Sequence, residues 1–168
     1  MTEHPEYEWV TWIDDDIILT NPTISLDYFL QLCSNQHKEF IISEALAIED
    51  GIPLNAGLFL IKNTKKMRDF LDEIWIYGGE KQYFAYPSLL EQQAMTELIR
   101  DSKAISDLVQ IIPVGILQSY LGRAHHPAKV QWQPHHFAGH MNALDYTTRK
   151  NILHSQLTVY NPFNLQFN

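Results

Sequence analysis

The chain has 168 residues, a formal net charge of −8 and hydrophobic residues at 45% of its positions. This length and composition are typical of one globular domain, which we expect to span residues 1–168. The lone Cys33 excludes an internal disulfide framework and a multi-cysteine zinc site. The acidic balance disfavours a nucleic acid as partner.

The first elements are expected around a run of acids. Residues Tyr7 to Leu19 combine aromatic and β-branched side chains with three consecutive acids, which predicts a buried strand that carries charge at its end. Asn21-Pro22 then ends the pairing, because proline lacks the N–H donor. A short helix follows, capped by Ser25 or Asp27, with one apolar face made of Leu26, Phe29, Leu30 and Cys33.

The middle of the chain predicts two short buried strands and a helix. The strands are expected over Phe40 to Ser43 and Leu58 to Ile61, with Asn55-Ala56-Gly57 leading into the second one. Residues Thr64 to Tyr77 carry an apolar stripe at helical spacing, and Gly78-Gly79 is expected to end this helix.

The second half predicts one more helix and one more strand. Ser88 is expected to cap a helix that runs to Ser102, with Glu91 completing a capping box. Residues Asp107 to Val114 predict a strand, and the stretch from there to His135 is rich in turn-forming residues and predicts a loop. Strands that alternate with amphipathic helices indicate an α/β domain with a mostly parallel or mixed sheet flanked by helices.

Three adjacent carboxylates are the first candidate for chemistry. Asp14, Asp15 and Asp16 repel one another unless a cation or several donors offset their charge. Alternate strand residues share a face, so Asp14 and Asp16 can converge on one hard cation such as Mn²⁺ or Mg²⁺. A solvated turn is the other interpretation, although the apolar residues on both sides place the acids against a core.

Histidines near the C-terminal end are the second candidate. His136 is followed by Phe137, Ala138, Gly139 and His140. An imidazole at His136 suits a mixed carboxylate and imidazole shell around Mn²⁺, and Gly139 allows backbone amides to approach an anion. The chain has eight histidines, and the alternative interpretation for most of them is that they are surface residues of loops.

Four segments together resemble a known family. WIDDDIILTNP, LNAGLFLIKNT, EQQAMTEL and HFAGH, in this order, resemble the galactosyl- and mannosyltransferases of glycosyltransferase family 34, over roughly Glu8 to Asn142. The resemblance implies a GT-A fold and a retaining transfer of a galactose- or mannose-type hexose. The implied donor is a UDP- or GDP-hexose and the implied acceptor is a glycan.

The resemblance also assigns roles to residues. Asp14, Asp16 and His136 are implied to hold Mn²⁺ or Mg²⁺ at the donor diphosphate. Asn55, Ala56 and Gly57 are implied to line the sugar site, and Glu91 and Gln92 to lie at the reacting carbon.

The lysine that the family commonly places after the last segment is absent, and His140 or Arg149 could neutralise the diphosphate instead. Glu91 as a plain capping acid and Asn55-Ala56-Gly57 as a plain turn stay open.

Another departure from the family pattern concerns the N-terminal side. The resemblance implies further strands ahead of the Asp-x-Asp strand, and only 13 residues precede Asp14. We therefore expect an N-terminally truncated GT-A-like fold in which Glu8 to Ile13 forms an edge strand. Such an edge exposes Trp9 and Trp12 and favours self-association or a partner chain.

Two other functions are kept beside the transferase. The first is a catalytically degenerate transferase fold that binds carbohydrate or a partner, and the second is a metallohydrolase built from the same carboxylates and histidine. The sequence shows no signal peptide and no membrane span, and together with the cysteine count this leads us to expect a cytoplasmic location.

Overall fold

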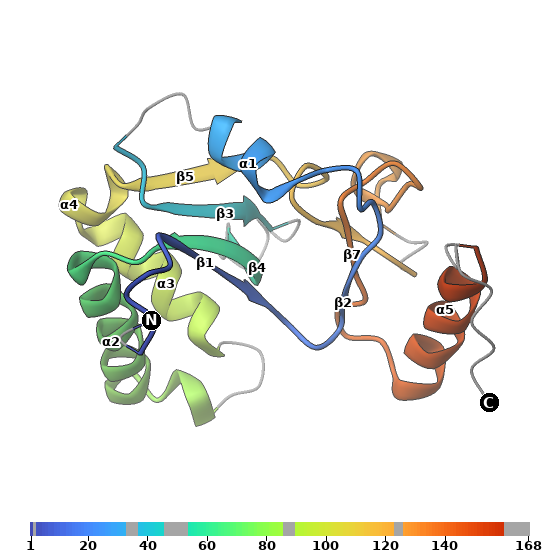
Figure 1. Cartoon of the computed structure of the whole chain (residues 1–168). Coiled ribbons are helices and arrows are strands. Elements are labelled where there is room, and N and C mark those ends of the chain that lie inside the picture. The colour runs from blue at the N-terminus through green and yellow to red at the C-terminus, as the bar shows by residue number, and fades with distance from the viewer. Residues whose placement is uncertain (2, 33–36, 46–53, 86–89, 123–125, 160–168) are drawn as a thin grey trace.

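The fold contains two β-sheets that lie side by side (Figure 1). The computed structural model describes residues 1, 3–32, 37–45, 54–85, 90–122 and 126–159. The larger sheet has the order β1-β4-β3-β5, and the smaller has the order β2-β7-β6. The strands are β1 (Trp9–Ile13), β2 (Ile17–Leu19), β3 (Phe40–Glu44), β4 (Leu54–Lys62), β5 (Val109–Ile112), β6 (Ser119–Tyr120) and β7 (Ala138–His140).

Both sheets are mixed. In the larger sheet β4 runs antiparallel to β1 and β3, whereas β5 runs parallel to β3. In the smaller sheet β7 is antiparallel to β2 and parallel to β6. Mixed sheets flanked by helices confirm the predicted α/β class.

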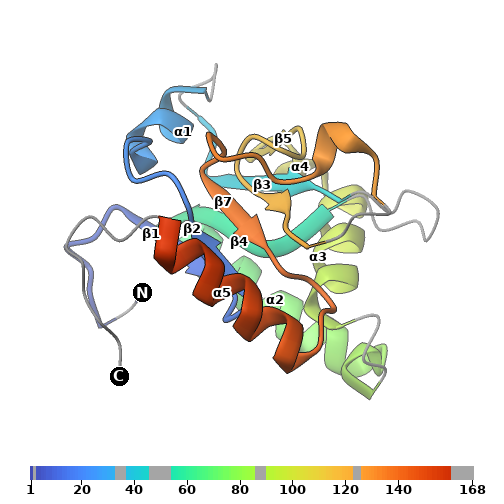
Figure 2. The ribbon, with the colours of Figure 1, turned by 90° about the vertical axis from the view of Figure 1, so that its right-hand side faces the viewer.

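Helices cover both faces of the larger sheet. They are α1 (Leu26–Leu32), α2 (Lys65–Glu80), α3 (Leu90–Asp101), α4 (Lys103–Ser106) and α5 (Tyr146–Val159), with short 3₁₀ helices η2 (Tyr83–Ala85) and η3 (Ala128–Val130). Helices α2 and α3 lie on one face of the larger sheet and α1 on the other, while α5 lies beside the smaller sheet (Figures 1 and 2). A layered arrangement of this kind buries each apolar strand face against a helix.

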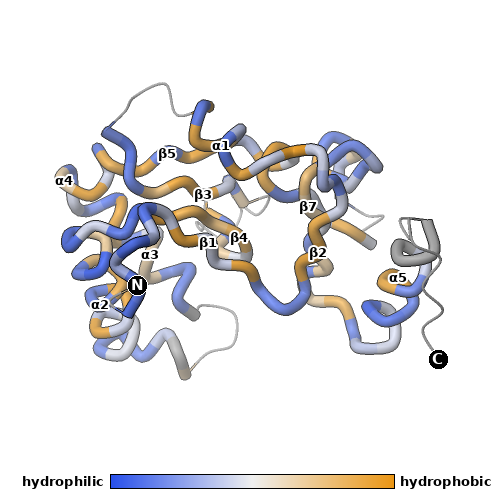
Figure 3. The backbone as a smooth tube through the Cα atoms, in the orientation of Figure 1, coloured by the Kyte–Doolittle hydropathy of each residue, from blue (hydrophilic) through white to orange (hydrophobic). Residues whose placement is uncertain are grey.

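Strand β4 lies at the centre of the core. Phe59 and Ile61 pack toward α2 and α3, in a cluster with Phe40 and Phe70. Leu58 and Leu60 belong to a second cluster on the other face. Both faces of β4 are covered, and its residues from Leu54 to Ile61 are buried. Much of the β4 tube is accordingly coloured hydrophobic in Figure 3, with Leu58 to Ile61 as its continuous apolar run.

The strand predicted to end at the acids is confirmed as β1, but the residues after the acids form a second strand, β2, in the other sheet. The acids form a turn, closed by the Ile17 N–H donating to the Asp14 carbonyl at 3.2 Å. Strand β1 precedes this turn and belongs to the larger sheet, whereas β2 follows it and belongs to the smaller one. Three like charges in sequence cannot all be buried in a continuous strand, and the turn leaves Asp15 exposed.

Helix α2 begins as predicted but continues further. The Thr64 hydroxyl accepts a hydrogen bond from the Met67 N–H at its first turn, a standard N-cap. Gly78 and Gly79 lie inside the helix, which runs to Glu80, so the predicted end is wrong. Gly78 is buried, and packing of this turn outweighs the modest helix penalty of glycine.

Two other boundaries differ from the prediction. Asn55-Ala56-Gly57 lies within β4 and is not a lead-in turn, because β4 starts at Leu54. The stretch predicted as a loop contains β6 and η3. Both segments are held by partners distant in sequence, which local patterns do not show. Cys33 and Ser88 lie outside the described residues.

Strand β1 lies at the edge of the larger sheet, as predicted, with β4 on one side only. Trp12 on this strand is 55% exposed. The described helices include none that is both long and apolar enough to cross a membrane.

Candidate functional site

The candidate site lies where the chain passes from one sheet to the other. The Asp14 N–H donates to the Gly57 carbonyl of β4 at 2.8 Å, which ties Asp14 to the larger sheet. The Met141 N–H donates to the Asp16 carbonyl at 2.9 Å, directly after β7, which ties Asp16 to the smaller sheet. The two carboxylates are thus positioned by different sheets.

His140 at the end of β7 completes a cluster with these aspartates. Asp14, Asp16 and His140 each offer one ligand atom, and these atoms lie within 4.8 Å of one another. His140 Nε2 lies 3.1 Å from Asp16 Oδ1, and both residues are buried. Two carboxylates and an imidazole form a donor set that suits Mn²⁺ and related divalent cations.

Arg149 of α5 adds a positive charge to the cluster. Its Nη2 lies 2.9 Å from Asp16 Oδ2, so both carboxylate oxygens of Asp16 have a basic neighbour. The hydrogen bond with His140, with added attraction from His140 and Arg149, holds the pKa of Asp16 below its ordinary value against the effect of burial. Asp16 is therefore ionised over the physiological pH range.

Asp14 has a different environment. Burial raises its pKa, although the Trp12 Nε1–H donates to Asp14 Oδ1 at 2.7 Å and acts in the opposite direction. Two aspartates two residues apart thus have pKa values shifted in opposite directions. This difference comes from burial at Asp14 and from basic partners at Asp16.

The His140 ring fits into a space that Gly57 leaves free. A Cβ built on Gly57 would lie 2.5 Å from His140 Cε1 and 2.9 Å from His140 Nδ1. His140 Nδ1 is buried and has no hydrogen-bond partner among the described residues. An unpaired buried imidazole nitrogen is a costly arrangement, and the other ring nitrogen, Nε2, lies against Asp16. With Asp14 and Asp16 within reach of the same ring, the residues present fit a divalent metal ion.

The predicted ligand His136 does not lie in this cluster. Ile17 pairs with His140 in antiparallel register, and the Thr20 N–H donates to the Phe137 carbonyl at 2.8 Å, so His136 lies toward the far end of β2. Among the described residues, the histidine that lies with Asp14 and Asp16 is thus His140 and not His136.

His136 has structural partners of its own. Its Nδ1 accepts the Gln133 N–H at 3.2 Å and lies 2.6 Å from the Ser119 hydroxyl. Burial, with the neighbouring His135, lowers the pKa of His136. A neutral ring that accepts at Nδ1 is consistent with both contacts, and it joins the loop before β7 to β6.

The Asn55-Ala56-Gly57 segment lies in the wall of the site. The Gly57 N–H donates to Asn55 Oδ1 at 3.0 Å, and Asn55 Nδ2 donates to the Tyr120 hydroxyl at 3.2 Å. The Ala56 N–H donates to Gln92 Oε1 of α3 at 2.9 Å. Gln92 therefore contacts the segment that the family resemblance implies at the sugar.

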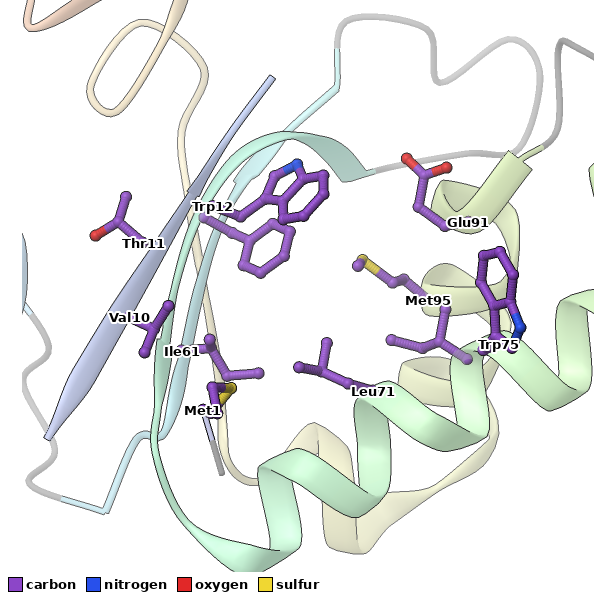
Figure 4. Close-up of a pocket in the computed structure, with 11 residues that line it drawn as sticks. Met1, Val10, Thr11, Trp12, Ile61, Leu71, Trp75, Glu91 and Met95 are labelled. Carbon is purple, nitrogen blue, oxygen red and sulfur yellow. The ribbon is translucent and has the colours of Figure 1, made fainter. Parts of the chain in front are cut away.

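Glu91 and Gly139 have other surroundings. Glu91 lines an apolar pocket of about 420 Å³ together with Trp12 and Trp75 (Figure 4). Gly139 lies inside β7, where an added Cβ would meet Leu121 Cδ2 at 2.8 Å, so the absence of a side chain there serves packing.

Two further residues at the site were not found from the sequence. Tyr120 of β6 bonds to Asn55, and its ring is stacked near that of His140 with centroids 6.4 Å apart. Gln118 Nε2 donates to the Asn55 carbonyl at 3.2 Å. Both come from the stretch predicted as a loop, and no local motif marks them.

Known proteins resemble this chain in sequence and in fold. It is 31% identical over 117 residues to probable glycosyltransferase 7 of Oryza sativa subsp. indica, and 28% identical over 118 residues to galactomannan galactosyltransferase 1 of Cyamopsis tetragonoloba. Each match covers 67% of this chain, but only 25% and 26% of the respective relatives. The chain therefore spans about a quarter of the length of these relatives.

A solved structure shares the fold. The crystal structure of a glycosyltransferase involved in the glycosylation of the major capsid of PBCV-1 matches with a TM-score of 0.63 and 14% identity, over 91% of this chain and 69% of that one. The model of the galactosyl transferase GMA12/MNN10 family matches residues 1–150, most of the chain and all of the cluster around Asp14, Asp16 and His140. The chain belongs to this galactosyl transferase family.

Proposed function

We propose that this chain carries the metal-binding part of a retaining hexosyltransferase, which moves a galactose- or mannose-type sugar from a UDP- or GDP-hexose to a glycan acceptor. One observation carries the proposal: Asp14, Asp16 and His140 converge at the junction of the two sheets, in a chain of the galactosyl transferase family. Membership of the family supports hexosyl transfer, and the donor set supports a divalent cation.

The leaving diphosphate requires positive charge near the cluster. A Mn²⁺ or Mg²⁺ ion held by Asp14, Asp16 and His140 would supply Lewis-acid stabilisation of that leaving group without proton transfer. Arg149, already 2.9 Å from Asp16, provides a guanidinium next to the same place. We assign to Arg149 the charge neutralisation that the family's usual lysine would otherwise give.

The sugar is proposed to lie against the Asn55-Ala56-Gly57 segment. Gln92 Oε1 is engaged by the Ala56 N–H, so Gln92 acts as a positioning residue that fixes this segment relative to α3. Glu91, one residue earlier, lines the pocket that also contains Trp12, whose indole bonds to Asp14. Its carboxylate is the acidic group proposed to stabilise positive charge on the sugar as the bond to the diphosphate breaks.

Isothermal titration of Mn²⁺ together with UDP or GDP tests the proposal. We expect nucleotide binding that requires the metal, and we expect Asp16→Asn to abolish it. The control is Asp15→Asn, since Asp15 is exposed and outside the cluster. Failure of the unmodified chain to bind nucleotide at millimolar concentrations, with metal present, would contradict the proposal.

One observation favours a second function. Both carboxylate oxygens of Asp16 are held by protein groups, at 3.1 Å by His140 and at 2.9 Å by Arg149, which stabilises the carboxylate without a cation. A transferase fold that binds carbohydrate without turnover would have this arrangement. Release of hexose from a nucleotide sugar, dependent on Asp14 and His140, would exclude that alternative.

A further inference from the structure

We propose that Arg149 determines which ligand the cluster of Asp14, Asp16 and His140 accepts. Because Arg149 already neutralises Asp16, a divalent cation alone binds weakly there, whereas a cation that enters together with a diphosphate binds tightly. This role of Arg149 rests on the proposed function and deepens it, since it names the ligand class that the cluster requires. Its support is the geometry of one ion pair, the anchoring of Arg149 on α5 and the balance of charge around Asp16.

The ion pair between Arg149 and Asp16 is partly shielded from water. Arg149 Nη2 lies 2.9 Å from Asp16 Oδ2, and the two side chains are 30% and 10% exposed. Salt screens such a pair less than it screens a pair on the open surface. His140 lies against the other oxygen of the same carboxylate, Oδ1. The guanidinium therefore leaves the His140 side of Asp16 to a cation, and its positive charge stays next to that cation.

The first turns of α5 hold Arg149 in this position. Asp145 caps the helix, because its carboxylate accepts the Thr148 N–H at 3.0 Å and the Thr148 hydroxyl at 2.6 Å. The Arg149 N–H donates to the Asp145 carbonyl at 3.0 Å. Three residues further along, Ile152 packs at Gly122, where an added Cβ would lie 2.6 Å from Ile152 Cδ1. Arg149 is thus presented by an anchored helical segment on both sides of it.

The balance of charge determines what the cluster can hold. With Asp14 and Asp16 ionised and Arg149 beside them, the empty cluster carries one net negative charge. A divalent cation alone would convert it to one net positive charge in a partly buried place, which is unfavourable. Asp15 does not offset this charge, since it is exposed and screened by water. A diphosphate that binds together with the cation removes the excess, so the pair is the ligand that the cluster favours.

Arg149 also has a donor that the described part of the chain does not use. Its Nε is buried and has no hydrogen-bond partner among the described residues. A guanidinium offers five N–H donors in a planar fork, and phosphate oxygens accept them in pairs. A buried donor without an acceptor is costly. An anion with several oxygens, such as a diphosphate, therefore suits Arg149 better than a single chloride or carboxylate.

The test titrates MnCl₂ alone and the preformed Mn²⁺–UDP complex into the whole chain. Quenching of tryptophan fluorescence follows binding, because Mn²⁺ is paramagnetic and the Trp12 Nε1–H donates to Asp14 Oδ1 at 2.7 Å. We expect the complex to bind about tenfold more tightly than the cation alone, and the Mn²⁺–UMP complex to lie between the two. Equal affinities for MnCl₂ and Mn²⁺–UDP would overturn the role of Arg149 and leave the proposed cation site intact. Absence of binding in both titrations would overturn both.

Arg149→Met separates an effect of charge from an effect of structure. We expect MnCl₂ alone to bind this variant more tightly than the unmodified chain and Mn²⁺–UDP to bind it more weakly, so that the ratio of the two affinities falls about tenfold. A merely structural role of Arg149 would weaken both. Arg149→Lys keeps the charge and is expected to retain most of the ratio.

Lys150→Met is the matched control, because it removes the same charge from the next, exposed residue of α5. We expect it to leave the ratio of the two affinities unchanged. An unchanged ratio in Arg149→Met, or an equal fall in Lys150→Met, would overturn the proposal. The comparison of ligands on the unmodified chain decides the question even if Arg149→Met does not fold.

Discussion

The imidazole of His140 occupies the space that a side chain on Gly57 would fill, with only 2.5 Å between His140 Cε1 and an ideal Cβ on Gly57. The backbone of Gly57 holds Asp14 through its carbonyl, so the same glycine positions two members of the cluster. An added methyl group must move the ring, since the backbone of β4 is fixed by neighbours on both sides.

Gly57→Ala is therefore expected to weaken Mn²⁺ binding strongly while the protein stays folded, as measured by titration calorimetry and circular dichroism. The matched control is Gly79→Ala on α2, where an added Cβ meets nothing within 4 Å. There we expect unchanged metal binding and a gain of about 0.5–1 kcal/mol in the free energy of unfolding, because alanine is the better helix former. Equal metal affinity in both variants would contradict the crowding argument.

The two histidines near β7 predict opposite results for metal binding. His140→Gln removes the imidazole beside Asp16 and is expected to abolish metal-dependent UDP or GDP binding. His136→Gln, in the adjacent loop, is expected to leave it within about threefold, since its partners are Ser119 and Gln133. Loss of binding in His136→Gln, with His140→Gln unaffected, would favour the ligand set expected from the sequence.

The stability of the fold is expected to depend on pH through His136. Its pKa is lowered in the folded state by burial and by His135, so the unfolded chain binds the proton more readily. The resulting stability is present above the unfolded pKa of about 6.5 and is lost as pH falls through the lowered folded value. Thermal unfolding followed between about pH 8 and pH 5 should therefore show a smaller decrease for His136→Gln than for the unmodified chain. Identical decreases would argue against His136 as the group responsible.

The bond between α3 and β4 predicts an effect on both stability and binding. Gln92→Leu leaves the Ala56 N–H without its acceptor, which is expected to cost about 1–3 kcal/mol of unfolding free energy in chemical denaturation. Gln92→Glu keeps an acceptor oxygen and is expected to recover most of that loss. If Gln92 also positions the sugar site, KM for the donor should rise in Gln92→Leu while binding of the free nucleotide stays unchanged.

The buried elements could be predicted from the sequence because local patterns determine them. The apolar run around Leu58 to Ile61 and the amphipathic stripe after Thr64 indicate a strand and a helix, and the structure has both. The sheet change at the acids was missed because Trp9 to Leu19 has strand-like composition on both sides of the turn. Only pairing with partners distant in sequence, β4 for one part and β7 for the other, separates the two strands.

The aspartates of the site were predicted from the sequence as one group, whereas His140 was predicted as a neighbour of the diphosphate and His136 was expected beside the aspartates. Asp14 and Asp16 stand out locally because adjacent carboxylates next to apolar residues need an explanation. Which of His136 and His140 lies beside the aspartates depends on the register of β7 against β2. The two histidines are only four residues apart in one segment, and the local sequence does not determine that register. Tyr120 and Gln118 carry no local signal, and their contacts exist only because β6 pairs with β7.

The turn of three aspartates is also the shortest of the chain's connections between the two sheets, since the others run from β2 to β3 and from β5 to β6. Asp14 is bonded to the larger sheet through Gly57, Asp16 is bonded to Met141 directly after β7, and His140 belongs to β7 of the smaller sheet. The distance between the ligand atoms is consequently a measure of how the two sheets are placed relative to each other. A ligand bound to all three side chains would hold the two sheets together. A small displacement of either sheet would change the distances to the ligand and thereby its affinity.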